Sequence, residues 1–206
     1  MKATIVAVAL ACAACAPVQR AGEVRELRAS TQPAVLFADS DDTAKLDAVW
    51  QGAPAASFVQ WDEPEVHDRQ IRFSSALQPS ARFASEAAAR AAFAAITLMP
   101  GMPITGQLDV QNAQPFYRRV IELATSHPAF TRGELHPLVT DAPMDVIAYG
   151  RGDVVVLVNT RPRDVDVTVH GRTLHHARDL VYGWVQSGDR VKLSAYGTAI
   201  LDPRRR

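Results

Sequence analysis

The sequence contains little cysteine and no excess of charge of either sign. Its two cysteines, Cys12 and Cys15, lie in the first 17 residues, so a chain cleaved there has no internal disulfide to form. Lysine and arginine together number 22, as do aspartate and glutamate. This balance gives no electrostatic reason to expect nucleic acid or an acidic surface as a partner. The 48% hydrophobic content is that of a globular protein with a sizeable core.

Motifs that would indicate several enzyme classes are also missing. The sequence has no glycine-rich phosphate loop and no nucleophile elbow. His175 and His176 are adjacent, and on a strand they would face opposite sides and could not bind one metal ion, even with His170 nearby. His67 and Asp68 lie in a charged loop without further ligands. We therefore expect no cofactor and no metal site.

The first 17 residues, "MKATIVAVALACAACAP", indicate export. Lys2 precedes about a dozen small apolar residues, a pattern typical of a secretory signal. The apolar run is shorter than the roughly 20 residues of a membrane span. "ALAC" and "CAAC" resemble bacterial lipoprotein processing sites, which would place a lipid on Cys12 or Cys15. We expect a lipoprotein of the bacterial cell envelope that touches the membrane only through its lipid. Plain export to the periplasm or medium and a misread helix are the alternatives.

Residues 22–108 alternate between helical and apolar strand patterns. Strands are expected at "TQPAVLFADSDD", "ASFVQWD", "QIRFSSAL" and "MPIT", and short helices at "EVRELRAS" and "DTAKLDAVW". The alanine-rich "SEAAARAAFAAITL" predicts a helix, because Ser85 suits the N-cap, Glu86 suits the first turn and Pro100 ends it. Alternation of this kind is typical of parallel βα units.

After residue 108 the sequence predicts one helix, and beyond that helix the pattern changes to short strands. "PFYRRVIELATSH" predicts one more helix, with Phe116, Val120, Leu123 and Ala124 on one stripe. Six segments rich in β-branched residues follow, separated by turns, and they predict an antiparallel β-sandwich. These segments are "ELHPLV", "DVIAYG", "DVVVLVNT", "VDVTVHG", "TLHHARDLVYG" and "RVKLSAYGTAILD". The expected organisation is a leader at 1–17, an α/β domain at 22–128 and an all-β domain at 129–203.

The order of these features resembles the alpha-amylase family of glycoside hydrolases. "FASEAAARAAFAAITLMPGMPITGQLDV" is similar to the helix, Pro-Gly-x-Pro turn and last strand of the family's catalytic barrel. "DVIAYGRGDVVVLVNTRPRDVDVTV", "DLVYG" and "YGTAILD" are similar to the small C-terminal β domain. The resemblance implies a fold class of α/β plus all-β: a partial (βα) barrel of about four parallel strands, followed by the sandwich.

The resemblance also implies that the catalytic acids are missing or changed. The family uses an Asp nucleophile, a Glu acid/base and a third Asp, and a retaining mechanism needs two carboxyl groups about 5 Å apart. The resemblance places the first residues after the leader just before the fifth barrel strand, so the strand that would carry the nucleophile is missing. The sequence also contains no Gly-x-Arg-x-Asp pattern. Asp39 takes the acid/base position and is one methylene shorter than Glu, while residues 76–78 are Ala, Leu and Gln where Asn, His and Asp are usual. We expect a chain that is non-catalytic by itself.

Five aromatic residues form a candidate sugar-stacking set, because the apolar face of a sugar packs on an aromatic ring. These are Trp50, Trp61, Tyr149, Tyr182 and Trp184. They are scattered in the sequence, which favours packing in the core or an interface. Trp50 and Trp61 flank predicted strand ends, where a barrel would bind glucan, and are kept as carbohydrate-binding candidates.

Three functions remain open at this point. The first is an exported alpha-amylase-like protein related to alpha-glucan metabolism, a pseudoenzyme that would pair its open sheet edges with a second copy or a complementing chain. The second is a weak or partner-complemented alpha-glucan hydrolase or transferase, with Asp39 as the acid. The third is a module of the cell envelope that binds alpha-glucan or another polysaccharide.

Overall fold

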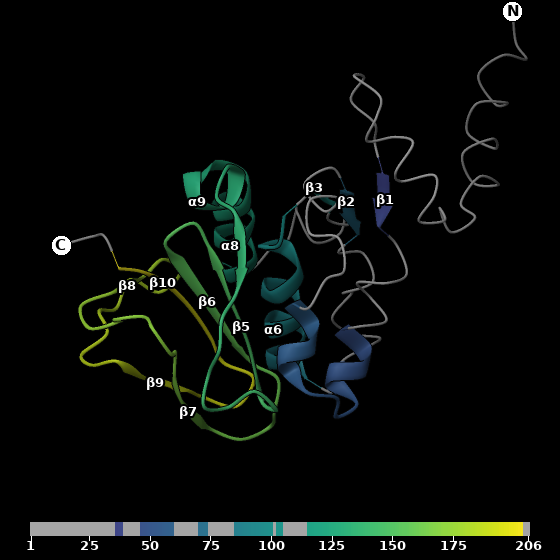
Figure 1. Cartoon of the computed structure of the whole chain (residues 1–206). Coiled ribbons are helices and arrows are strands. Elements are labelled where there is room, and N and C mark those ends of the chain that lie inside the picture. The colour runs from purple at the N-terminus through teal and green to yellow at the C-terminus, as the bar shows by residue number, and fades with distance from the viewer. Residues whose placement is uncertain are drawn as a thin grey trace, which may run out of the picture. The chain divides into compact units, whose positions relative to one another are not determined.

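The computed structural model describes residues 36–38, 46–59, 70–73, 85–100, 102–104 and 115–203 (Figure 1). The predicted leader, the helix at "EVRELRAS", and the residues Cys12, Cys15, Asp39 and Trp61 lie outside these ranges. Within the described ranges, no helix combines the length and the apolar composition that crossing a membrane requires.

Three short strands form a parallel sheet. They are β1 (Leu36–Ala38), β2 (Gln70–Phe73) and β3 (Met102–Ile104), in the order β1-β2-β3, with β2 parallel to both neighbours. Pro103 in β3 pairs with Arg72 at the edge of this sheet, where a strand tolerates proline because one of its sides needs no ladder donor. Three of the four predicted strands of this region are therefore present. Closure of the sheet into a barrel stays a prediction.

The prediction of a strand at "ASFVQWD" is wrong for the residues of this segment that the structure describes. Residues Ala55–Val59 form a 3-10 helix, η1, whose buried members are Ala55, Phe58 and Val59. This spacing puts the apolar side chains on one helical face. Helix η1 packs against strand β5 (Val146–Arg151) of the C-terminal part of the chain. The short helix expected in "DTAKLDAVW" is present at residues 46–50, where Leu46 and Val49 are buried.

Two longer helices form where the sequence predicts them. Helix α6 (Glu86–Thr97) begins after Ser85, whose hydroxyl accepts a hydrogen bond from the Ala88 N–H at 3.1 Å. Helix α8 (Pro115–Ser126) buries the predicted stripe, with Ala124 only partly covered. A further one-turn helix, α9 (Pro128–Thr131), was not predicted; it starts at a proline in the first helical position and is capped by His127.

The C-terminal strands form two antiparallel sheets, as predicted. The larger has the order β4-β5-β6-β10-β8, made of β4 (Leu135–Pro137), β5 (Val146–Arg151), β6 (Val154–Asn159), β10 (Thr198–Asp202) and β8 (Arg178–Asp179). The smaller pairs β7 (Val165–Thr168) with β9 (Arg190–Leu193). Two predicted strands differ. Only two residues of "TLHHARDLVYG" are strand, and "RVKLSAYGTAILD" divides into β9 and β10 at a turn in which Tyr196 has a φ of 52°.

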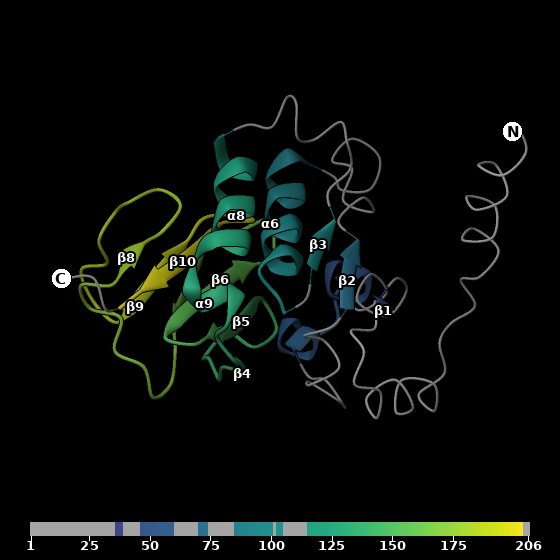
Figure 2. The ribbon, with the colours of Figure 1, turned by 90° about the horizontal axis from the view of Figure 1, so that it is seen from above.

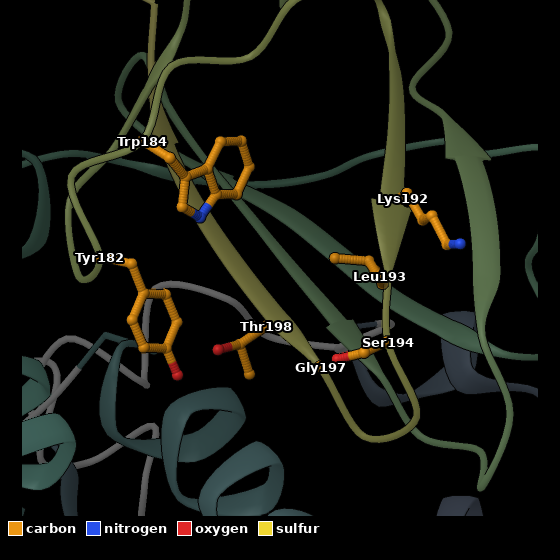
Figure 3. Close-up of a pocket in the computed structure, with 7 residues that line it drawn as sticks. All are labelled: Tyr182, Trp184, Lys192, Leu193, Ser194, Gly197 and Thr198. Atoms are coloured by element: carbon orange, nitrogen blue, oxygen red, sulfur yellow. The ribbon is translucent and has the colours of Figure 1, made fainter.

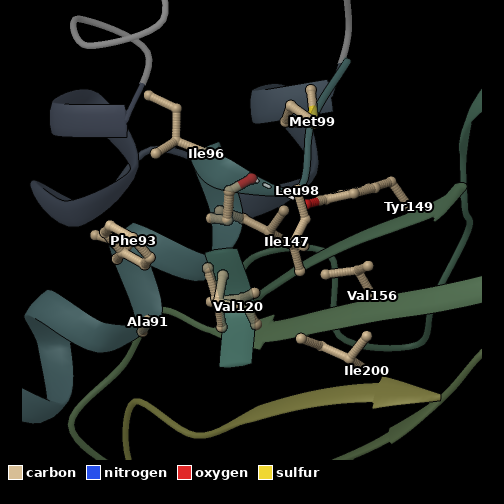
Figure 4. Close-up of a cluster of buried hydrophobic side chains, with 14 of the residues drawn as sticks. Ala91, Phe93, Ile96, Leu98, Met99, Val120, Ile147, Tyr149, Val156 and Ile200 are labelled. Carbon is tan, nitrogen blue, oxygen red and sulfur yellow. Dashed lines mark hydrogen bonds between the residues drawn. The ribbon is translucent and has the colours of Figure 1, made fainter. Parts of the chain in front are cut away.

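Every residue of β5 and β6 is buried, because both faces of the larger sheet are covered. Ile147 and Val156 point to one face, where they join Phe93 of α6 and Val120 of α8 in the first core (Figure 4). Alternate residues such as Leu157 point to the opposite face, which packs on β7 and β9. Figure 2 shows α6 and α8 side by side next to this sheet. Buried residues on both sides of residue 128 belong to the first core, and the division into two domains at this position stays a prediction.

Candidate functional site

The described ranges include one of the predicted site residues. Trp50 is partly buried and packs against the first core, so its ring serves the interior in this structure. Tyr149 is fully buried in the same core, and its hydroxyl donates to the Ala95 carbonyl oxygen at 2.9 Å. Tyr149 is therefore a core residue, whereas a role of Trp50 in carbohydrate binding stays a prediction. Tyr182 and Trp184 differ from them, because 58% and 36% of their surfaces are exposed.

Tyr182 and Trp184 line a surface groove. One part of it has a volume of about 390 Å³, close to the lower end of the range for small-molecule sites, and Figure 3 shows its lining. A second part of about 160 Å³ continues toward Arg90 of α6 and Phe116 of α8, and shares Tyr182, Ser194, Gly197 and Thr198 with the first. We call the two parts together the Tyr182 groove.

The turn that carries the two aromatic rings is fixed by Asp179. One carboxylate oxygen accepts hydrogen bonds from the backbone N–H groups of Tyr182 (2.6 Å) and Val181 (2.9 Å). The other accepts from the Ile200 N–H at 2.9 Å, which ties the turn to β10. The Asp179 N–H closes the turn by donating to the Trp184 carbonyl at 2.8 Å. Only 1% of Asp179 is exposed, so these backbone donors satisfy a buried acid.

Burial raises the pKa of the Asp179 carboxyl above its ordinary value, while the N–H groups of Tyr182, Ile200 and Val181 act in the opposite direction. The pKa of the Tyr182 phenol is also raised, first by partial burial and then by the nearby charge of Asp179. Arg90 and Thr198 oppose the shift of Tyr182. The phenol is therefore neutral at ordinary pH, and it interacts with the side chains of Thr198 and Arg90.

The side chains around Tyr182 set its ring in place. Phe116 stacks against it, with ring centroids 6.2 Å apart and planes inclined by 29°. In Figure 3, Tyr182, Trp184 and Thr198 lie on the same side of β9, whereas Lys192 points away from them. Arg90 pairs with Glu86 at 3.2 Å, and Lys192 pairs with Asp164 at 3.4 Å.

The adjacent histidines are arranged differently from the prediction. Their ring centroids are 3.7 Å apart, because they lie in a turn and not in a strand, and His176 has a φ of 68°. Asp189 accepts the backbone N–H groups of Leu174 (2.7 Å) and His175 (3.0 Å), and these donors lower the pKa of its carboxyl. In the part of the chain that the structure describes, no three His, Cys, Asp or Glu side chains come together in a group suited to a metal ion.

The Tyr182 groove has the chemistry of a binding surface. Among the described residues that line it, none carries a carboxylate, so it lacks the acid pair of a glycosidase. It offers instead two partly exposed aromatic rings, the hydroxyl groups of Ser194 and Thr198, and two paired basic side chains. The sequence shows Tyr182 and Trp184 two positions apart but does not predict the groove beside them, because its other walls come from α6, α8 and the turn between β9 and β10.

Solved structures with a similar fold include two alpha-amylases and a trehalose-6-phosphate hydrolase. The maltogenic alpha-amylase AmyB from Thermotoga neapolitana matches 90% of this chain over 59% of its own, with a TM-score of 0.61 and 14% identity. The chain has an alpha-amylase-like fold. The alpha-amylase from H. orenii (TM-score 0.53, 15% identity) is matched over 81% of this chain and 48% of its own. Trehalose-6-phosphate hydrolase TreA from Bacillus licheniformis matches 86% of this chain over 54% of its own, with a TM-score of 0.56 and 12% identity.

These matches cover this chain more fully than they cover the solved structures. The alpha-amylase-like chain spans between 48% and 59% of the length of these three proteins. No protein-family model matches the sequence. No curated protein matches it either.

Proposed function

We propose that this alpha-amylase-like chain has a role concerning alpha-glucans and does not cleave them by itself. The observation that carries the proposal is the fold, which is similar to that of a maltogenic alpha-amylase over 90% of the chain. The Tyr182 groove adds support, because it presents neutral polar groups and aromatic rings and no carboxylate.

The proposed lack of cleavage rests on the acids that the resemblance assigns. Asp39 directly follows β1, and residues 76–78 follow β2. Because β1 and β2 are parallel neighbours, the segments that leave them start from the same edge of the sheet, as active-site segments of a barrel do. Residues 76–78 are Ala, Leu and Gln, so Asp39 alone carries a carboxyl group at these positions. One carboxyl group cannot act as nucleophile and as proton donor to the same glycosidic bond.

Incubation of the purified full-length chain with maltooligosaccharides tests this proposal. We expect the sugars to stay intact when they are separated by anion-exchange chromatography after prolonged incubation. Asp39→Asn should leave that result unchanged, as should Asp41→Asn, the matched substitution two residues further on. Shorter products that appear with the natural chain and Asp41→Asn, and disappear with Asp39→Asn, would show that Asp39 takes part in catalysis and would overturn the proposal.

We also propose that the chain is exported and carries a lipid on Cys12 or Cys15. The support is the leader-like pattern of the first 17 residues. Expression in a bacterial host with a labelled fatty acid should transfer label to the natural chain. One of the two variants, Cys12→Ala or Cys15→Ala, should lose that label while the other keeps it. Equal labelling of both variants would contradict a lipid on a single cysteine.

A further inference from the structure

Exposed apolar surface is concentrated next to the Tyr182 groove. Five large hydrophobic side chains are exposed in the described ranges, and Tyr182, Trp184 and Val185 are three of them. They fall within four consecutive residues on one turn. Single exposed apolar residues are ordinary, whereas a cluster beside a groove indicates an interaction surface. This turn therefore has a feature that the folding of the chain alone does not explain.

Several contacts hold the turn that carries Tyr182 and Trp184. Asp179 holds it through its two carboxylate oxygens, and Gly183 has a φ of 78°, which lets the chain reverse between the two aromatic residues. The Gly183 N–H donates to the Asp179 carbonyl at 3.0 Å. Phe116 supports the Tyr182 ring. Rings that are already in place lose little conformational entropy when a ligand stacks on them.

The charges of the groove favour a neutral ligand. Both basic side chains that line it are paired with carboxylates, Arg90 with Glu86 and Lys192 with Asp164. The remaining polar groups near the rings include the hydroxyls of Ser194 and Thr198. A ligand that complements them has flat apolar faces bordered by hydroxyl groups, and a sugar ring combines these two properties.

We propose that the Tyr182 groove binds a short alpha-glucan chain, whose glucose units stack on Tyr182 and Trp184 and hydrogen-bond to Thr198 and Ser194. This inference rests on the proposed function, from which the choice of an alpha-linked glucan follows. Asp179 acts as a positioning residue, because it holds the turn and does not line the groove. The groove is a binding site, separate in its chemistry from any bond-cleaving centre.

Isothermal titration of the full-length chain with maltoheptaose tests the inference. Tyr182→Ala and Trp184→Ala should each weaken binding roughly tenfold or more, since each removes a stacking ring. Trp184→Phe should restore part of the affinity, because it restores an aromatic face. Val185→Ala is the matched control, as it changes an exposed apolar side chain of the same turn that does not line the groove. Circular dichroism checks that each variant is folded, and Trp184→Ala decides if Tyr182→Ala does not fold.

The outcomes separate the assignment of the groove from the proposed role concerning alpha-glucans. Binding that is weakened by both alanine variants and kept by Val185→Ala supports the inference. If the natural chain binds maltoheptaose and the groove variants bind equally well, the groove assignment is wrong while a role concerning alpha-glucans stands. If the natural chain binds cellohexaose as tightly, the assignment to alpha-linked glucan is wrong. Absence of all binding would overturn the inference and also remove the support that the groove gives to the proposed function. Self-association that Trp184→Ala abolishes in light scattering would instead assign the surface to a second copy.

Discussion

Replacement of Arg151 by methionine should destabilise the chain strongly. Arg151 is 3% exposed, and among the described residues its guanidinium donates to three carbonyl oxygens. These are Leu98 at 3.0 Å, Phe130 at 2.6 Å and Gly133 at 3.1 Å. Leu98 caps the C-terminal end of α6, and Phe130 belongs to α9. The cation thus connects β5 to carbonyl groups at helix ends, where the helix dipole also favours a positive charge.

The magnitude follows from the number of bonds and their burial. A hydrogen bond from a charged donor contributes about 1.5 to 3 kcal/mol, but methionine keeps the apolar stem and some carbonyls will find other donors. We therefore expect the free energy of unfolding to fall by about 3 to 5 kcal/mol, because three carbonyl groups lose a charged donor. That is a large share of the roughly 5 to 15 kcal/mol that a domain has. Arg151→Lys should recover part of the loss, because an ammonium group can still donate but lacks the planar fork.

Urea unfolding followed by circular dichroism measures this effect. Arg118→Met, on the exposed side of α8, is the matched control and should change the free energy of unfolding by less than about 0.5 kcal/mol. A midpoint for Arg151→Met that equals the midpoint of the control would refute the reasoning that Arg151 joins the sheet to the helices.

Three smaller effects are expected elsewhere. Tyr149→Phe removes the buried hydrogen bond to Ala95 and should lower the free energy of unfolding by about 1 kcal/mol; no change in a urea titration would contradict it. Ser85→Ala removes the N-cap of α6 and should cost about 1 kcal/mol, whereas Ser85→Asp should retain the stability in the same assay. The Thr168 N–H lowers the pKa of the Asp141 carboxyl below 3.8, so the charged form stabilises the fold above that pH and the benefit is lost as pH falls through the lowered value. The natural chain should therefore have a higher Tm than Asp141→Asn near neutral pH, and the difference should shrink in acid; a difference that is constant with pH would be inconsistent with this assignment.

Elements with strong local signals were predicted well from the sequence. Helix α6 is rich in alanine, and it has a capping serine before it and a proline after its end, and all three act locally. Strands β5 and β6 consist largely of β-branched and apolar residues, as strands buried on both faces require. Their pairing follows from the short turn between them.

Elements that depend on contacts far along the chain were not predicted. The apolar residues of η1 suit a strand and a helix equally, and packing against β5 decides between them. The histidine pair was misplaced because a positive φ at His176 puts both rings on one side of a turn. The Tyr182 groove combines α6, α8 and two turns of the β domain, so no local pattern could have located it.

The central claim is that the chain binds an alpha-glucan and does not cleave it. Equilibrium dialysis of the purified full-length chain against maltoheptaose, with chromatography of the sugar from both chambers, tests this claim most directly. The claim predicts that the sugar accumulates on the side of the protein and is recovered at its original length. Equal concentrations in the two chambers, or the appearance of shorter maltooligosaccharides, would contradict it.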